Sequence, residues 1–284
     1  MNPARNASAL VLSLILSSQR YVSPAASAFN FKRHNSSKLP LAPIISIMPS
    51  GTKTTPIDLP VKDVGTHSKY EKHAAGFWNR LANHYYNQPI KDGEAYEKKL
   101  EITRGYLTPQ SKILEFGCGT GGTAIKHASY VHTVHAIDFS SKMIDIAKDQ
   151  AAKADPAVPN VKFQCVGIDS YQVPEASYDV VMGMSILHLL PNKDQVLGRV
   201  HTMVKPGGYF VSSTTCMGDF AGTFLKYVAP PLSRMGLLPK LIVFTKDELK
   251  ASIEKAGFTI EEEYQSGDGK DKEAAVFLVA KKIG

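Results

Sequence analysis

The chain has 284 residues, of which 43% are hydrophobic and 21% charged, a composition typical of one large or two small globular domains with a proper core. Its formal charge of +7 first suggests a nucleic-acid or membrane partner. Residues 1–57, however, contain six basic residues and no Asp or Glu, so the rest of the chain is close to neutral. The charge therefore belongs to the leader, and a nucleic-acid partner is not expected.

The first 28 residues have the pattern of a signal peptide. Arg5 precedes an apolar run over residues 9–16, which is far too short to span a bilayer. Small residues follow at Ala25, Ala26 and Ala28, so we expect cleavage after Ala28.

Residues 29–56 are rich in Ser, Pro and Lys and resemble a disordered transit peptide. Residues 26–29, Ala-Ser-Ala-Phe, resemble the Ala-Phe junction of bipartite leaders that direct proteins into the complex plastids of algae. The expected location is therefore the plastid (chloroplast). Two alternatives stay open: a plain secretory leader, or translation from Met48, which would leave the protein cytoplasmic. The N-terminal sequence of the mature protein distinguishes them.

From about residue 70, helical and strand-like segments alternate, which predicts an α/β fold with a mostly parallel, doubly wound sheet. Helices are expected over residues 77–86, 94–106 and 141–154. Short apolar runs predict buried parallel strands over residues 112–116, 133–138, 161–166, 178–184 and 209–213.

The end of the chain predicts one more helix and a hairpin. Thr245 and Glu248 form a capping box, and Gly257 ends the helix that follows it. Residues 258–264 and 274–281 then have the pattern of two strands joined by a polar loop over residues 266–273.

The strand over residues 112–116 leads directly into a glycine-rich turn. The spacing of Gly117, Gly119 and Gly122 fits a dinucleotide fingerprint, in which missing side chains let backbone amides approach a polar ligand at a helix N-terminus. Glu115 argues against a pyrophosphate there, because a carboxylate would repel it. The spacing alone leaves the kind of nucleotide-like cofactor open.

Asp138 ends the next strand, 19 residues after Gly119. A carboxylate at this place can accept both ribose hydroxyl protons, as ribose-binding acids do in nucleotide folds. The alternative is a cap for the following helix, which Ser140 or Ser141 can provide without it.

With its Glu-x-Gly-x-Gly turn, Asp138 and the terminal hairpin, the chain from about residue 70 onward resembles the class I S-adenosylmethionine-dependent methyltransferases of the small-molecule "type 11" kind. The resemblance implies a Rossmann-like, seven-stranded, mostly parallel sheet with an antiparallel last strand, N-terminal helices and a lid insertion, within a domain over residues 57–284. It places Gly117 and Gly119 beside the amino-acid end of S-adenosyl-L-methionine. Glu115 would fix the loop or receive the cofactor's ammonium through water.

Two further motifs support the resemblance. After the third strand, Asp169 would lie near the adenine amino group and Ile168 would line the ring; alternatively Asp169 starts a turn and Ile168 belongs to the core. After the fourth strand, Met184 would face the cofactor, and His188 is the candidate general base. A histidine that holds loop backbone together is an equally good interpretation of His188.

Two segments would close the site. Tyr86 is assigned to the cofactor and Trp78 and Tyr85 to a substrate lid, because they resemble family aromatics; alternatively Trp78 packs the helix onto the sheet. The apolar, Pro-rich insertion over residues 216–244 would cover a small apolar or amphipathic substrate, or else lie peripherally on a membrane. Its lid residues are Phe220, Phe224, Tyr227 and Arg234, and Lys226, Arg234 and Lys240 are candidates for recognising a carboxylate.

The sequence also narrows the partners. It has no Asn-Pro-Pro-Tyr or Pro-Cys motif of nucleic-acid methyltransferases, and its three cysteines, Cys118, Cys165 and Cys216, have no zinc spacing, so no metal is expected. The expected partner is a small methyl acceptor, with the chain a monomer or homodimer.

The first substrate hypothesis is S-methylation of a carboxylated thioether such as 4-methylthio-2-hydroxybutyrate, in dimethylsulfoniopropionate biosynthesis, because a thioether sulfur has no proton to lose. The rival is C- or O-methylation of a prenyl quinone or another apolar metabolite. A different class is an NAD(P)-dependent oxidoreductase, which would need a Tyr-x-x-x-Lys dyad after the fourth strand that the sequence lacks. A non-catalytic cofactor-binding protein is the third hypothesis.

Overall fold

The computed structural model describes residues 69–90, 92–220, 222–235, 238–266 and 275–284. Within these ranges seven strands form one sheet in the order β3-β2-β1-β4-β5-β7-β6. Only β7 runs antiparallel to its neighbours, which confirms the predicted fold class. The strands are β1 (Lys112–Phe116), β2 (Thr133–Asp138), β3 (Val161–Cys165), β4 (Tyr178–Met184), β5 (Val204–Thr214), β6 (Phe258–Tyr264) and β7 (Val276–Lys282).

The central strands are apolar on both faces because helices cover both sides of the sheet. Ile113 and Leu114 of β1 and Val180 and Val181 of β4 are completely buried. Consecutive residues of each pair belong to different core clusters, one on each side of the sheet.

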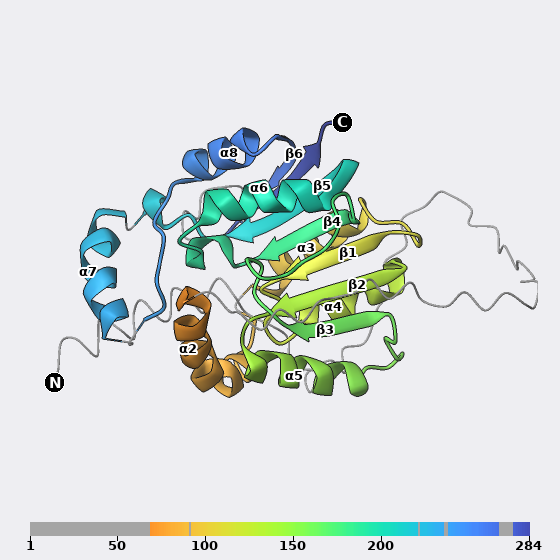
Figure 1. Ribbon diagram of the computed structural model, residues 1–284, viewed down its shortest axis with the longest axis horizontal. Coiled ribbons are helices and arrows are strands. Elements are labelled where there is room, and N and C mark those ends of the chain that lie inside the picture. The colour runs from red at the N-terminus through yellow and green to blue at the C-terminus, as the bar shows by residue number, and fades with distance from the viewer. Residues whose placement is uncertain (1–68, 91, 221, 236–237, 267–274) are drawn as a thin grey trace, which may run out of the picture.

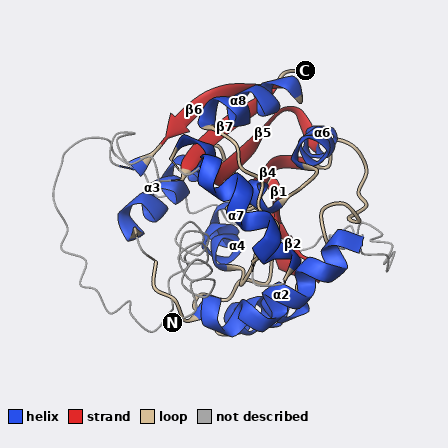
Figure 2. Ribbon diagram, turned by 90° about the vertical axis from the view of Figure 1, so that its left-hand side faces the viewer, coloured by secondary structure: helices blue, strands red, loops and turns tan. Residues whose placement is uncertain are grey.

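The helices form two layers around the sheet. α6 (Lys193–Met203) and α8 (Lys246–Lys255) cover one face, and α3 (Gly93–Arg104) and α4 (Gly122–His127) cover the other (Figure 1). α5 (Ser141–Ala152) packs beside β2 and β3. α2 (Lys69–Tyr86) and α7 (Gly222–Arg234) lie beyond the carboxyl ends of the parallel strands, the end that faces the viewer in Figure 2. The described residues also contain three single-turn 3-10 helices: η2 (Ala128–Tyr130), η3 (Leu187–Leu189) and η4 (Met217–Asp219).

Strand β5 starts earlier than predicted. Val204 pairs with Tyr178, the chain leaves register over residues 205–208, and pairing resumes between Tyr209 and Val180. Gly207 has a φ of +76°, a left-handed conformation that favours glycine. The Pro-Gly-Gly triplet interrupts the apolar pattern, so the sequence predicts the strand only after this turn.

The prediction for α8 is confirmed. The Thr245 side chain accepts a hydrogen bond from the Glu248 backbone N–H at 3.2 Å, and the Glu248 carboxylate accepts one from the Thr245 N–H at 2.8 Å. Gly257 follows the helix with a φ of +99°, as expected for a helix stop.

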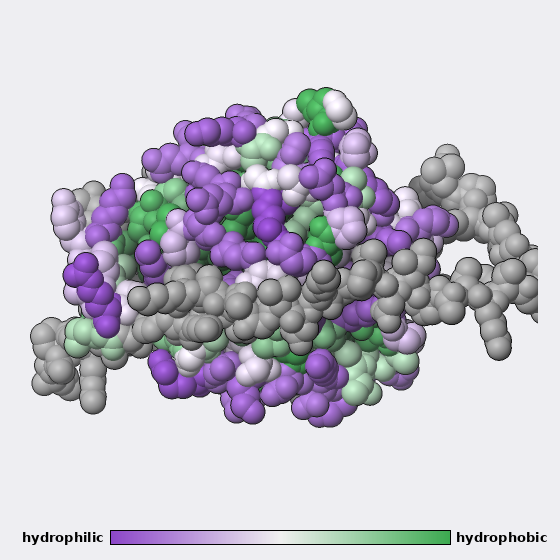
Figure 3. Space-filling view, in the orientation of Figure 1, coloured by the Kyte–Doolittle hydropathy of each residue, from purple (hydrophilic) through white to green (hydrophobic). Residues whose placement is uncertain are grey.

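Helix α7 occupies part of the predicted lid insertion. Leu225, Ala229 and Leu232 face the interior, whereas Tyr227 and Met235 are 78% and 69% exposed. The face of the molecule seen in Figure 3 is mainly hydrophilic, with hydrophobic side chains in small separate areas. Among the described helices none is long and apolar enough to cross a bilayer. The predicted leader and most of the loop before β7 lie outside the described residues.

Candidate cofactor and active site

The glycine-rich turn joins β1 to α4 in a conformation that needs glycine. Gly117, Gly119 and Gly121 have φ values of +64°, +53° and +83°. A Cβ on Gly117 would lie 2.7 Å from Ile186 Cγ1, whereas one on Gly119 would meet nothing closer than Tyr85 Cε1 at 3.8 Å. The missing side chain of Gly119 thus leaves room between the loop and Tyr85.

Asp138 lies at the carboxyl end of β2, next to this turn. Its Oδ2 accepts a hydrogen bond from the Gly119 N–H at 3.0 Å, and its Oδ1 accepts one from the Ser140 N–H at 2.8 Å. Burial raises the pKa of Asp138 to about 6, although these two hydrogen bonds oppose the shift. Both oxygens keep lone pairs that a hydroxyl-bearing ligand could use.

Glu115 lies beneath the turn and is only 2% exposed. Burial raises its pKa to about 8, against the effect of a hydrogen bond from the Ala124 backbone. Its Oε2 has no hydrogen-bond partner among the described residues. A buried carboxyl oxygen without a partner is costly, and a cationic group bound at the turn would satisfy it.

Two adjoining cavities open along this edge and share four lining residues, so they form one groove. The first cavity is lined by side chains and backbone from α2, the turn and the end of β4; the second lies toward β3. The shared residues are Gly117, Asp138, Phe139 and Ile186; the first cavity adds Trp78, Tyr85, Gly119, Met143, Met184, Ser185 and Leu189, and the second adds Glu71, Phe116, Val166, Gly167, Ile168, Asp169 and Leu190.

Helix α2 forms the roof of this groove. Glu71, Trp78 and Tyr85 line it, and their spacing of seven residues places them on one face of the helix. Asn79 ties the helix to the start of α5, because its Oδ1 accepts hydrogen bonds from Ser140 Oγ at 2.7 Å and the Lys142 N–H at 3.2 Å. A ligand in the groove would therefore be enclosed by the sheet edge and α2.

The carboxylate of Glu71 fills the far end of the groove. It is 3% exposed and accepts a hydrogen bond from Ser170 Oγ at 3.3 Å. A Cβ on Gly167 would lie 1.6 Å from Glu71 Oε1, so a larger residue there would require the Glu71 carboxylate to move. Asp169 lines the same end and accepts a hydrogen bond from Asn192 Nδ2 at 2.9 Å.

Most of the predicted cofactor residues come together in this groove. Gly117, Gly119, Asp138 and Met184 line the first cavity, and Ile168 and Asp169 line the second. The predicted lid residues Trp78 and Tyr85 line the first cavity as well, whereas Tyr86 lines neither. Glu71 is a groove residue that was not predicted, although its spacing of seven residues from Trp78 was a usable signal.

His188 is completely buried and lines neither of the two cavities. Its Nδ1 forms a hydrogen bond with Thr214 Oγ1 at 2.9 Å, and its carbonyl oxygen accepts one from the Ile242 N–H at 2.8 Å. Burial lowers the pKa of His188 to about 4. These contacts favour the structural interpretation of His188, in which the histidine joins a loop to a strand.

Of the predicted lid residues of the insertion, the three whose side chains are described line neither cavity. Phe220 packs against the core, Tyr227 and Arg234 are exposed, and the Phe224 side chain lies outside the description. Lys226 and Lys240 are also exposed.

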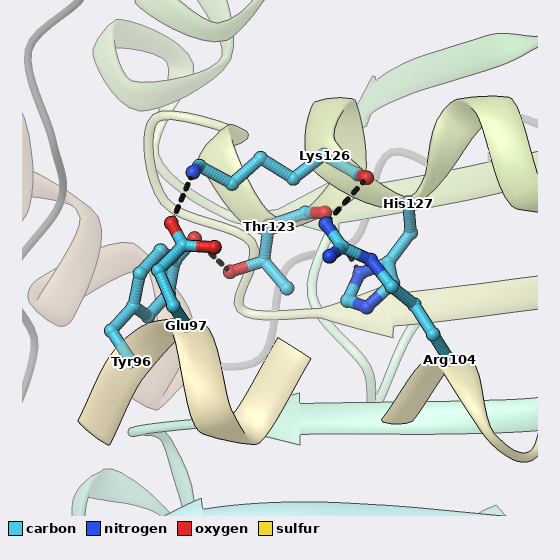
Figure 4. A network of polar contacts seen from close by, with 6 residues as sticks. All are labelled: Tyr96, Glu97, Arg104, Thr123, Lys126 and His127. Carbon is cyan, nitrogen blue, oxygen red and sulfur yellow. Dashed lines mark hydrogen bonds and ion pairs between the residues drawn. The ribbon is translucent and has the colours of Figure 1, made fainter. Parts of the chain in front are cut away.

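A polar network fixes the helix that follows the glycine-rich turn (Figure 4). Tyr96 Oη and Thr123 Oγ1 form a hydrogen bond at 3.2 Å, and Lys126 Nζ forms an ion pair with Glu97 at 2.6 Å. Arg104 Nη2 donates to the Lys126 carbonyl at 3.4 Å. These contacts join α3 to α4 and so hold the turn in place. Within the described ranges, no group of three or more His, Cys, Asp or Glu could hold a metal ion.

Comparison with known proteins is consistent with this geometry. Residues 113–208 match the family model described as "Methyltransferase domain". The chain is 32% identical over 115 residues to 27-O-demethylrifamycin SV methyltransferase of Amycolatopsis mediterranei and 33% identical over 104 residues to a ubiquinone biosynthesis O-methyltransferase of Albidiferax ferrireducens. These matches cover 40% and 36% of this chain, and the chain spans 40% of the length of each relative.

The fold has solved counterparts. Phosphoethanolamine N-methyltransferase 2 of Haemonchus contortus, in complex with phosphomonomethylethanolamine and S-adenosylhomocysteine, aligns with a TM-score of 0.55 and 16% identity, over 77% of this chain and 59% of that one. The segment that matches the family model, residues 113–208, contains the glycine-rich turn, Glu115, Asp138 and the end of β4. The match to the model described as "Methyltransferase domain" thus covers the part of the chain that forms the sheet side of the groove.

Proposed function

We propose that the chain is an S-adenosyl-L-methionine-dependent methyltransferase that acts on a small molecule. The observation that carries the proposal is the groove over the matched segment, where open space at Gly119 meets the carboxylate of Asp138. Beneath the turn, and outside the lining of both cavities, lies the buried Glu115 Oε2, which has no hydrogen-bond partner among the described residues. These features fit a ligand with a ribose and an ammonium group. When bound, the cofactor supplies a sulfonium methyl group already activated for displacement.

The residues of the groove divide between the parts of such a cofactor. Asp138 would accept the ribose hydroxyl protons, and Glu115 would balance the ammonium charge. The second cavity, with Ile168 as an apolar wall and the oxygens of Glu71 and Asp169 as acceptors, would hold the adenine. Tyr85 and Met184 lie in the first cavity and would exclude water from the methyl group.

The lining of the first cavity bears on the acceptor. Among its described residues there is no histidine, lysine or arginine, and its one carboxylate is Asp138. Alignment of nucleophile, methyl carbon and sulfur is then the main contribution of the site. An acceptor without a proton to lose suits such a site, which supports S-methylation of a carboxylated thioether such as 4-methylthio-2-hydroxybutyrate.

The second candidate acceptor is a prenyl quinone or another apolar metabolite. It is supported by the aromatic and aliphatic lining of the first cavity and by the similarity to a protein named ubiquinone biosynthesis O-methyltransferase. A phenolic oxygen would need to arrive ionised or to find a base outside the described cavities.

Methyl transfer can be measured directly. Purified protein is incubated with methyl-labelled S-adenosyl-L-methionine and either 4-methylthio-2-hydroxybutyrate or a demethylated prenyl quinol. Label in one product assigns the acceptor, and the Asp138→Asn variant should lose that transfer. If neither product is labelled, both acceptor hypotheses are wrong. If the protein does not bind S-adenosylhomocysteine, the proposed enzyme class is wrong as well.

The proposed location is the plastid, on the basis of the leader alone. Expression of the full chain with a C-terminal tag, followed by N-terminal sequencing of the mature protein, tests it. A start at or after Phe29 supports import, and a start at Met48 contradicts it.

A further inference from the structure

We propose that Lys99, together with the hydroxyl groups at the end of β5, forms a subsite for a carboxylate or phosphate group beside the methyl-transfer centre. The inference deepens the proposed function and rests on it. It concerns a residue of α3 that neither the sequence motifs nor the two cavities include.

The ammonium of Lys99 is held by a neutral partner. Its Nζ donates to Ser213 Oγ at 3.2 Å, and no ion pair with a carboxylate is present among the described residues. An ammonium has three donors, so two are left for other acceptors. Burial lowers the pKa of Lys99 to about 8, with Asp92 opposing the shift. A partly buried cation of this kind is stabilised when an anion binds.

The end of β5 carries two hydroxyl groups near in sequence, Ser213, which contacts Lys99, and Thr215, two residues further on. Ser213 is 3% exposed, and the hydroxyl of Thr215 is buried without a partner in the described part of the chain. Hydroxyl groups donate to carboxylate and phosphate oxygens as readily as they accept from an ammonium. The Ser213 hydroxyl, already in contact with the cation, can therefore be the second donor to an anion bound there.

The subsite is adjacent to the groove. Ser213 is the register partner of Met184 on β4, and Met184 lines the first cavity. Paired residues of neighbouring strands lie on the same sheet face, about 5 Å apart. The Ser185 N–H, on a residue with a φ of +55°, donates to the Ser213 carbonyl at 2.6 Å and joins the cavity wall to β5. Lys99 is thus hydrogen-bonded to the strand residue that lies next to the cavity wall.

The neighbouring residue Lys98 provides a matched control. It is exposed and pairs with Glu101 at 3.0 Å on the outer side of α3. The polar network of Figure 4 holds α3 against α4, so Lys99 has a fixed backbone from which to present its charge. A loss of charge at Lys99 should change ligand binding, whereas the same loss at Lys98 should not.

The anion could be the amino-acid carboxylate of the cofactor or an acidic group of the acceptor, and two calorimetric arms separate these sources. The first compares S-adenosylhomocysteine with 5′-methylthioadenosine, which lacks the amino-acid end. If the cofactor supplies the anion, Lys99→Met weakens S-adenosylhomocysteine binding tenfold or more and leaves 5′-methylthioadenosine unchanged. Lys99→Arg should retain most of the affinity, and Lys98→Met all of it.

The second arm titrates inorganic phosphate or acetate into the protein, with and without saturating S-adenosylhomocysteine, and follows the melting temperature. If the acceptor supplies the anion, the wild-type and Lys98→Met proteins are stabilised and Lys99→Met is not. Equal behaviour of Lys99→Met and wild type in both arms would overturn the subsite. If Lys99→Met fails to fold, Lys99→Gln takes its place. A wild-type protein that binds no S-adenosylhomocysteine would contradict the proposed function, while the phosphate arm without cofactor would still test Lys99.

Discussion

Glu115 and Asp138 are two acids at the glycine-rich turn, the first buried and the second partly buried, and their surroundings differ. Asp138 accepts two backbone N–H groups, which partly offset burial, so its pKa rises only to about 6. Glu115 has an oxygen without a partner among the described residues, and its pKa rises to about 8. At neutral pH the free protein should therefore hold Asp138 mainly as a carboxylate and Glu115 mainly as a carboxylic acid.

The protonation of Asp138 should determine the lowest pH at which the cofactor binds tightly. Because a protonated carboxyl group cannot accept both ribose hydroxyl protons, the affinity for S-adenosylhomocysteine should fall as the pH drops through about 6. Asp138→Asn should bind about 10- to 100-fold more weakly at pH 7, the usual effect of losing hydrogen bonds to a charged group, and without this pH dependence. Calorimetric titration between pH 5 and 8 checks both, and a wild-type affinity that is constant over this range would contradict the role of Asp138.

Glu115 should lose a proton when the cofactor binds. When the cofactor's ammonium binds nearby, the carboxylate form is favoured, so the pKa of Glu115 should fall from about 8 and a proton should be released near pH 7. The measured binding enthalpy should then differ between phosphate and Tris buffers, which take up protons with different enthalpies. Glu115→Gln should remove that difference. An enthalpy independent of buffer in the wild type would show that Glu115 keeps its proton.

Among the elements, α2 depends on one close contact with the sheet edge. Gly167→Ala would place a Cβ 1.6 Å from Glu71 Oε1 and push the first turn of α2 away from the groove. We expect a loss of about 1–3 kcal/mol in the free energy of unfolding, as for other overpacked sites, and weaker binding of S-adenosylhomocysteine. Chemical denaturation and calorimetry measure the two effects.

The matched control for this substitution is Gly198→Ala in α6, where a Cβ would meet nothing within 4 Å. It should be neutral or stabilise the protein by up to about 1 kcal/mol, because alanine favours helix. Glu71→Ala combined with Gly167→Ala should restore much of the lost stability. Equal stability of the Gly167→Ala and wild-type proteins would contradict the contact.

These elements also show how far the sequence could predict the structure. Local signals were sufficient for β1, β2, β4 and β6, whose apolar runs end at turns, and for the capping box of α8. Helix α7 was not expected, because Pro230 and Pro231 within it normally argue against a helix. The contact of Lys99 with Ser213 joins residues 114 positions apart, and no local pattern reports such a pair.

At the scale of the whole molecule, the groove is assembled from separate parts of the chain. The glycine-rich turn and Asp138 lie at the sheet edge, whereas the roof comes from α2. Asn79 holds α2 to the start of α5, and Glu71, Trp78 and Tyr85 face the groove. A ligand that contacts both the sheet and α2 should therefore stabilise the roof more than the rest of the fold.

Hydrogen exchange measured by mass spectrometry can test this coupling. With S-adenosylhomocysteine at 100 times its dissociation constant, the whole domain should gain about 2.7 kcal/mol of stability. Slower amide exchange in α2 and in the first turn of α5 should show that the roof has closed on the ligand. NADH at the same concentration should give no such protection, because its pyrophosphate would meet the carboxylate of Asp138. Protection by NADH alone would favour the oxidoreductase hypothesis, and protection confined to the sheet would show that α2 takes no part in holding the cofactor.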